Sequence, residues 1–164
     1  MAGHAIYARH LRIDKARRLD IALIKRCIRA ALDAENVDMP CEISVLICDD
    51  AAIRAINSEF RGIDRATDVL SFPMQDLTPG AFVPAEAAGL PETGLLPLGD
   101  IVLSVDRVDE QAARFGQTRE RETAYLVIHS VLHLLGYDHM DEGPDKIKMR
   151  EREKAILTKV GYGE

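Results

Sequence analysis

The sequence predicts an α+β fold in which a small mixed β-sheet is flanked by helices, in an α/β-type sandwich. Three observations lead to this prediction. Several segments repeat apolar residues at helical spacing, several shorter ones are rich in β-branched residues, and the two kinds alternate only loosely. With 164 residues, of which 47% are hydrophobic and 29% charged, the chain is long enough to bury a core. We therefore expect one domain over residues 1–164.

Three segments are predicted to be strands. Residues 41–50, CEISVLICDD, carry apolar side chains on both faces, which is typical of a buried strand. Residues 67–72, TDVLSF, form a shorter strand that Pro73 ends, and residues 99–106, GDIVLSVD, form a third. Between the last two, residues 74–98 are rich in proline and glycine, which predicts a long loop that acts as a functional flap or a mobile insertion.

Four helices are predicted around these strands, and all except the short one at residues 108–116 are amphipathic. They are expected at about residues 15–34, from residue 50, at residues 108–116, and from residue 144 to about residue 160. Asp49 or Asp50 can cap the second helix, and Pro144 can open the last. The predicted apolar stripes are Ile21, Ile24, Ile28 and Leu32 in the first helix, Ile53, Ile56 and Phe60 in the second, and Ile147, Ile156, Leu157 and Val160 in the last.

The longest predicted helix covers residues 118–136. Thr118 suits its N-cap, and Glu120 and Glu122 lie in its first turn, where acidic side chains are favoured. Gly136 can adopt a positive φ and end the helix. Apolar residues surround the second half of this helix on nearly all sides, so we expect it to be buried.

Three of the five histidines lie in residues 129–139, HSVLHLLGYDH. His129 and His133 are four residues apart, so a helix places them side by side with Cβ atoms about 5–6 Å apart. Gly136 then turns the chain and brings His139 toward the same point. This spacing is that of the metzincin zinc motif. The alternative is a buried helix with satisfied core histidines, but unpaired imidazoles there would be costly, so we favour a three-histidine metal site.

One position departs from the metzincin motif. Ser130 stands where those proteases carry the glutamate that acts as general base, and a hydroxyl cannot take that role at neutral pH. Three histidines leave one coordination position open for water, whose pKa falls to about 7 on zinc. The metal-bound hydroxide could act on its own or with a base from elsewhere, for which Asp138 is the nearest candidate in the sequence. The residues alone thus indicate hydrolytic chemistry without the usual protease base.

A second segment of interest is residues 56–73, INSEFRGIDRATDVLSFP. Arg61 and Arg65 follow a predicted helix end, and a guanidinium can bind phosphate or carboxylate through two hydrogen bonds. The alternative is that both are ordinary surface arginines, and that Thr67, Asp68 and Ser71 only cap and pair the following strand.

These motifs together resemble the bacterial YbeY family, also called UPF0054. The resemblance rests on HSVLHLLGYDH, on NSEFRGIDRATDVLSFP, on LPLGDIVLS, and on MREREKAIL, which carries Met149, Glu153 and Leu157 at the family's C-terminal spacing. It extends from about residue 42 to the final helix. Ser130 replaces the glycine of most members, and residues 76–97 look longer than the corresponding loop of compact members.

The resemblance implies a zinc-dependent, single-strand-preferring endoribonuclease that acts in small-subunit rRNA maturation and ribosome quality control. It implies one zinc ion on His129, His133 and His139 and a catalytic and phosphate-binding role for Arg61. Asp138 is a catalytic candidate from the residues alone, not from the resemblance. Arg65 and Ser71 are further substrate-binding candidates. The implied partners are single-stranded rRNA, the small ribosomal subunit, and ribosomal proteins or an assembly GTPase; neither DNA nor a membrane is expected.

Charge and cysteine content bear on these expectations. The net charge of −6 argues against a protein that coats nucleic acid indiscriminately, although basic residues cluster between residues 9 and 29. Cys27, Cys41 and Cys48 show no metal-binding spacing and are predicted to be reduced, buried thiols of a cytoplasmic protein. Two alternatives stay open: a non-catalytic ribosome assembly factor that the metal stabilises, and a metalloprotease or amidase whose base comes from elsewhere in the fold.

Overall fold

The computed structural model describes residues 3–82, 94–137 and 143–163. Its sheet has four strands in the order β1-β2-β4-β3. The strands are β1 (Ala5–His10), β2 (Cys41–Cys48), β3 (Val69–Pro73) and β4 (Leu96–Ser104). The first three strands in this order are parallel to one another, and β3 pairs antiparallel to β4 at the edge of the sheet. The prediction of a small mixed sheet with flanking helices is therefore confirmed.

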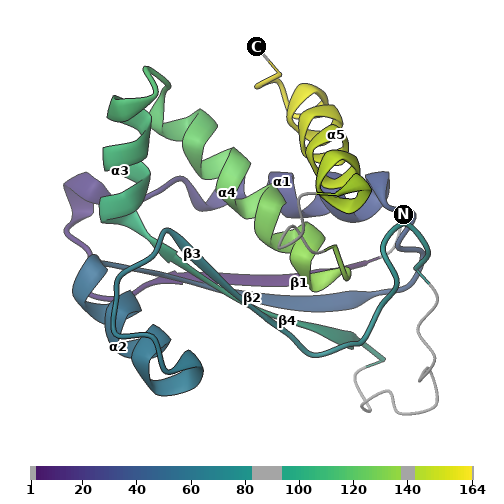
Figure 1. Cartoon of the computed structure of the whole chain (residues 1–164), viewed down its shortest axis with the longest axis horizontal. Coiled ribbons are helices and arrows are strands. Elements are labelled where there is room, and N and C mark those ends of the chain that lie inside the picture. Colours follow the sequence, from purple (N-terminus) through teal and green to yellow (C-terminus); the bar gives the residue numbers. More distant parts are fainter. Residues whose placement is uncertain (1–2, 83–93, 138–142, 164) are drawn as a thin grey trace.

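Helices cover the two faces of the sheet unequally. The helical elements of the described residues are η1 (Lys15–Arg17), α1 (Ile21–Ala34), α2 (Asp50–Arg61), α3 (Val105–Arg114), α4 (Arg119–Leu134) and α5 (Pro144–Lys159). Helices α1, α3, α4 and α5 lie on one side of the sheet, and α2 lies on the other (Figure 1). In the described part of the chain, no helix is both long enough and apolar enough to span a bilayer.

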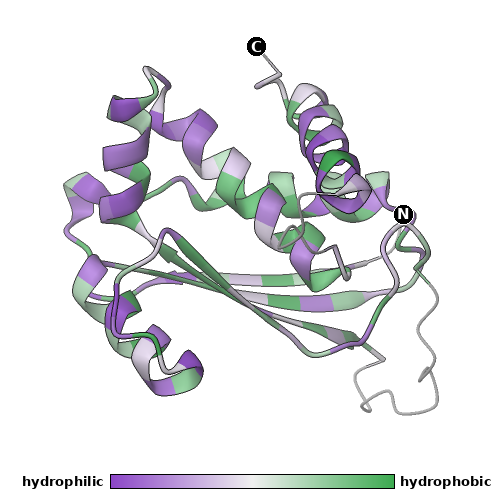
Figure 2. Ribbon diagram, viewed as in Figure 1, coloured by the Kyte–Doolittle hydropathy of each residue, from purple (hydrophilic) through white to green (hydrophobic). Residues whose placement is uncertain are grey.

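Helix α4 runs through the centre of the helical layer and packs against α1, α3, α5 and β3. Its apolar residues join the main core, and Figure 2 shows hydrophobic colour along much of its length. The Thr118 hydroxyl caps the helix by accepting a hydrogen bond from Arg121 N at 3.1 Å. The predicted start and burial of this helix are confirmed. The three cysteines are also free and buried, as predicted.

Several predicted boundaries were wrong. Helix α1 begins at Ile21 because the Asp20 carboxylate caps it at Leu23 N, and residues 15–17 form a separate 3-10 turn. The predicted loop ends earlier than residue 98, since β4 begins at Leu96. Helix α3 begins at residue 105, capped by Ser104, where a strand end was predicted.

Two further corrections concern apolar residues. Ile147 and Phe60 were expected on buried stripes, but they are 60% and 66% exposed. Strand β1 was not predicted, because Ile6 is the only buried residue of Ala5–His10 and the segment lacks a strong apolar period. Its backbone nevertheless completes the sheet beside β2.

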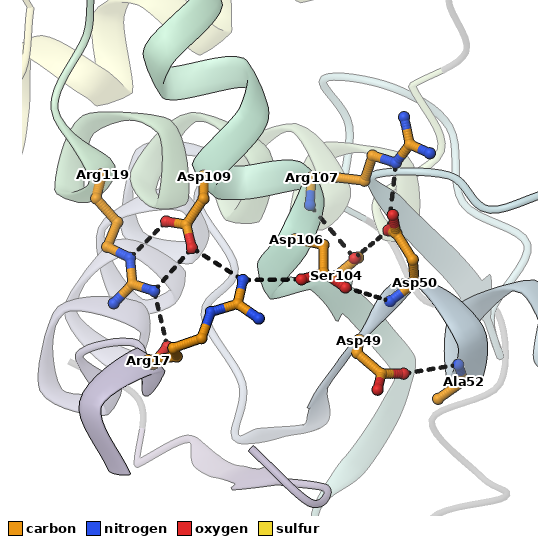
Figure 3. A network of polar contacts seen from close by, with 9 residues as sticks. All are labelled: Arg17, Asp49, Asp50, Ala52, Ser104, Asp106, Arg107, Asp109 and Arg119. Atoms are coloured by element: carbon orange, nitrogen blue, oxygen red, sulfur yellow. Dashed lines mark hydrogen bonds and ion pairs between the residues drawn. The ribbon is translucent and has the colours of Figure 1, made fainter. Parts of the chain in front are cut away.

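A network of ion pairs ties the start of the helical layer together (Figure 3). Arg17 in η1 contacts Asp106 at 2.8 Å and Asp109 at 3.1 Å, both in α3. Arg119 at the start of α4 contacts Asp109 at 2.7 Å and also donates to the Arg17 carbonyl at 2.8 Å. The network therefore holds η1, α3 and α4 in one arrangement.

This network predicts that acid weakens the fold. Hydrogen bonds from Arg119 and Arg17 lower the pKa of Asp109, and the Asp50 N–H and Arg17 lower the pKa of Asp106. A carboxylate with a lowered folded-state pKa contributes stability above its unfolded pKa of about 4, and that contribution is lost as the pH falls through the folded value. We expect the free energy of unfolding, measured by urea denaturation, to fall below about pH 4.

The Asp109→Asn variant should reduce this dependence on pH by about 1 kcal/mol or less, because the carboxylate is 37% exposed and water screens the pair. Asp38→Asn removes an exposed carboxylate outside the network and serves as the control. An unchanged pH profile in Asp109→Asn would contradict the assignment.

Candidate functional site at the end of α4

Helix α4 presents two imidazoles to one point. The Nε2 atoms of His129 and His133 lie 3.1 Å apart, and the ring centroids are 4.6 Å apart with an interplanar angle of 81°. Two nitrogens bound to one tetrahedral ion at 2.0–2.1 Å would be separated by about 3.3 Å. The spacing of this pair therefore fits two ligands of a shared zinc-type ion.

The other ring nitrogens are held by hydrogen-bond acceptors. His129 Nδ1 contacts the Glu153 carboxylate from α5, and His133 Nδ1 lies 2.8 Å from the Tyr137 carbonyl oxygen. An acceptor at Nδ1 places the ring proton there and leaves Nε2 as the nitrogen with a lone pair. Glu153 is only 5% exposed, so this contact is shielded from water. Carboxylate–histidine and carbonyl–histidine pairs of this kind are typical of metal-binding sites.

The chain that follows α4 is firmly anchored at Tyr137. Its hydroxyl donates to Glu35 Oε1 at 2.5 Å, and Arg152 Nε donates to Glu35 Oε2 at 2.6 Å. The predicted third ligand His139 and the predicted base Asp138 lie outside the described residues. Within the described residues, no three His, Cys, Asp or Glu side chains converge to hold a metal ion.

Gly136 makes the turn that ends the helix. Its φ is +101°, and a Cβ atom there would lie 2.1 Å from the Leu77 carbonyl oxygen. The predicted role of this glycine is confirmed, and the close approach to Leu77 adds a packing requirement that the sequence pattern did not reveal.

Gly136→Ala should therefore lower the free energy of unfolding by about 3 kcal/mol or more, since a backbone atom must move and a strained φ is imposed as well. Chemical denaturation measures this change. Gly116→Ala is the matched control, because Gly116 also has a positive φ but no atom lies within 4 Å of the point that a Cβ atom would occupy. It should cost only about 1–2 kcal/mol. Equal losses in the two variants would contradict the packing argument.

The histidine pair opens into a cavity of about 750 Å³, which we call the histidine cleft. Its walls come from β3, from residues 73–77 and from α4, and the guanidinium-bearing Arg61 lines it at the end of α2. Gly62, with φ of +70°, caps α2 and turns the chain directly after this arginine. Arg65 is exposed and lies outside the set of described residues that line the cleft.

Ser71 lines the histidine cleft, and its hydroxyl lies 2.5 Å from that of Ser130. This bond joins the edge strand β3 to α4. Ser130 is fully buried, so the residue at the position of the protease base serves to connect helix and sheet. The side chain there offers no carboxylate for peptide hydrolysis.

Two residues of the site were not predicted from the sequence. Glu153 was noted only with Met149 and Leu157 as part of the family resemblance, without a role in the site. No sequence pattern assigned a role to Tyr125. The Tyr125 ring lies 5.8 Å from that of His129, and burial raises the pKa of Tyr125 to about 12, so it remains a phenol at neutral pH. The signal for Tyr125 is its position four residues before His129 on the same helix face.

The fold and the site together define a class of α+β proteins in which a buried central helix presents paired imidazoles at the floor of a cleft beside an edge strand. A family model described as Endoribonuclease YbeY matches residues 9–161. The chain belongs to this family.

Individual relatives agree with this assignment. The protein named Endoribonuclease YbeY from Clostridium botulinum is 51% identical over 145 residues, which cover 82% of this chain and 84% of the relative. The one from Clostridium kluyveri is 49% identical over 145 residues, covering 84% of this chain and 87% of the relative. The solution structure of TM1509 from Thermotoga maritima matches 96% of this chain and 88% of its own, with a TM-score of 0.59 and 26% identity.

Proposed function

We propose that this chain is a metal-dependent endoribonuclease that cleaves single-stranded RNA in the maturation of small-subunit rRNA. The observation that carries the proposal is the pair of Nε2 atoms 3.1 Å apart at the floor of a cleft that Arg61 also lines. Family membership supports RNA as the substrate, since the relatives are named endoribonucleases.

The proposed cofactor is one zinc ion per chain, with His129, His133 and His139 as its ligands. The fit rests on the donor set, because neutral imidazole nitrogens with fixed tautomers are preferred zinc ligands. When bound, zinc would supply Lewis acidity to the phosphodiester and its attacking water. Quantifying the ions bound to the purified protein identifies the native metal.

The residues of the cleft have distinct proposed roles. Arg61 binds the scissile phosphate through its guanidinium fork and neutralises the charge that develops on the phosphate oxygens. Glu153 holds the Nδ1 proton of His129 and so keeps Nε2 directed into the cleft. Asp138 is the proposed base, and Ser71 positions the edge strand beside the substrate. Because A-form duplexes are wide and stiff, a cleft of this size favours single strands.

A role in ribosome quality control and a cytoplasmic location belong to the same proposal. The net charge of −6 is unusual for a protein that must bind RNA alone. We therefore propose that the small ribosomal subunit, through ribosomal proteins or an assembly GTPase, brings the substrate to the cleft.

A second candidate function is a non-catalytic assembly factor. The contact between His129 and Glu153 favours it, since a metal at this point would also fix α5 against α4. On that interpretation, His129→Ala lowers the melting temperature and ribosome association together, and the protein cleaves no RNA at any metal concentration.

The test of the proposed function uses the zinc-loaded protein and one RNA sequence, presented as a single strand and as a duplex. We expect internal cleavage of the single strand, little cleavage of the duplex, loss of activity with a chelator and recovery on adding zinc. Gel analysis of end-labelled RNA measures both products and rates. Chelator-resistant cleavage, or equal cleavage of both forms, would contradict the proposal.

A further inference from the structure

A second cavity adjoins the histidine cleft. It has a volume of about 700 Å³, lies among α3, α4 and α5, and shares Asp68 and Tyr125 with the cleft. The two cavities are therefore neighbours, so a single strand of RNA bound at the histidine pair could extend toward this one, which we call the side cavity. Its volume is within the usual range for small-ligand sites.

Glu122 lines the side cavity and is the unusual residue in it. The side chain is 4% exposed, yet no group in the described part of the chain donates a hydrogen bond to its carboxylate. The other carboxylates that line the cavity have hydrogen-bond partners. Asp68 accepts from Val69 N at 2.7 Å and from Gln111 at 3.2 Å, and Glu153 contacts His129 Nδ1. Among the described residues, only His4 Nε2 is a fully buried side-chain N or O atom without a partner, so the Glu122 oxygens are open to the side cavity. A ligand with N–H groups could donate to them there.

Glu122 also has a suitable position relative to the histidines. It precedes His129 by seven residues, which is two turns of α4 and about 10.5 Å along the same helix face. Tyr125 lies between the two and lines both cavities. A group bound at Glu122 would therefore lie about two helical turns from the histidine pair.

Cations from α5 also line the side cavity. Arg150 and Lys154 are four residues apart on α5, so their side chains extend from one helix face. Both are exposed, and neither forms an ion pair within residues 3–82, 94–137 and 143–163. A phosphate group of a strand that passes through the side cavity would meet both charges.

An aromatic ring completes the set. Phe115 lines the side cavity and is 59% exposed, and the Arg114 guanidinium lies 5.6 Å from its ring centroid. Exposed rings beside cations are typical platforms on which unpaired bases stack. The side cavity thus combines a surface for stacking, charges for a phosphate and a buried acceptor.

We propose that the side cavity is a base-recognition subsite in which the Glu122 carboxylate binds the N1–H and N2–H groups of a guanine next to the cleaved bond. The inference rests on the proposed RNA-cleaving function and adds a sequence preference to it. Guanine alone among the four bases offers two adjacent donors that match the two oxygens of a carboxylate. Uracil has one N–H between two carbonyls, and adenine and cytosine each place an acceptor nitrogen beside the amino group.

The test begins with the unaltered protein and altered RNA. Zinc-loaded wild type is given unstructured strands that differ at one position near the cut, with guanosine, inosine, adenosine, cytidine or uridine. Inosine lacks the 2-amino group but keeps N1–H. We expect a fixed position at which guanosine is preferred, and at which inosine lowers kcat/KM about 10-fold or more.

The variant Glu122→Gln should bring the guanosine-to-inosine ratio close to one, because an amide presents one acceptor and one donor group. Glu120→Gln, on the exposed side of the same helix, is the matched control and should keep the wild-type ratio. Circular dichroism melts verify that both variants fold. A guanosine preference that survives in Glu122→Gln would overturn the inference.

A binding measurement separates this inference from the proposed function. The guanosine and inosine strands are titrated by fluorescence anisotropy onto Arg61→Ala, which should bind RNA without rapid cleavage. If wild type cuts no RNA, the nuclease proposal fails, and the titration still tests the subsite. If wild type cuts RNA but neither rates nor affinities distinguish guanosine from inosine, the subsite proposal fails and the nuclease proposal stands.

Discussion

Replacing His133 with alanine is expected to reduce cleavage of single-stranded RNA by about a thousandfold or more. A bound metal stabilises transition-state charge by several kcal/mol, and each 1.4 kcal/mol is about tenfold in rate. The variant removes one of the two Nε2 atoms that lie 3.1 Å apart, so the proposed zinc ion would lose a ligand. Single-turnover kinetics measure the loss of RNA cleavage, and metal analysis of the same sample measures the loss of bound zinc.

Changing Glu153, whose carboxylate contacts His129 Nδ1, should reduce zinc affinity and activity by a smaller factor. Glu153→Gln keeps the size of the side chain but weakens the acceptor at Nδ1, and loss of such a partner costs about 10–100-fold in metal affinity or activity. Glu151→Gln, on the exposed face of α5, is the control and should have no effect on zinc binding. If Glu153→Gln and Glu151→Gln bind zinc equally well, the orienting role of Glu153 is wrong.

Replacing Arg61 with alanine is the second change with a large expected effect. Removing one preorganised donor from a developing anion costs about 10²–10³ in kcat in enzymes where this has been done. Arg61 lines the histidine cleft, so we expect kcat for single-stranded RNA to fall by this factor, with a smaller change in KM.

Two further variants sharpen the result for Arg61. Arg61→Lys keeps the charge but loses the bidentate fork, so it should recover only part of the rate. Arg54→Ala removes an arginine from the same helix that is 57% exposed and paired with Asp64, and its rate should equal that of the wild type. An equal loss in Arg54→Ala and Arg61→Ala would point to general charge and away from a position in the cleft.

Much of the fold could be predicted because several signals agreed locally. The cap at Thr118, the burial of α4 and the turn at Gly136 each have a short-range cause, and all three were predicted. Strand β1 escaped prediction because its place depends on pairing with β2, more than thirty residues later, and its own side chains are mixed. Pairing between distant segments leaves little trace in a local pattern.

In the site, too, features with a local cause could be predicted and those that depend on distant segments could not. The spacing of His129 and His133 follows from helix geometry, so their convergence could be predicted from the sequence. Their hydrogen-bond partners could not, because Glu153 and Tyr137 reach the rings only through the packing of α5 and the turn after α4. The side cavity is likewise formed by three helices, and no single segment of the sequence predicts it.

The contact between His129 and Glu153 has a consequence for how the protein is made. A growing chain on the ribosome that has not yet passed α5 carries its histidine pair without the acceptor that orients one of the rings. On the proposed function, we therefore expect cleavage competence only after α5 has been synthesised. If so, a chain still lacking α5 would not cut the RNA of the ribosome that synthesises it.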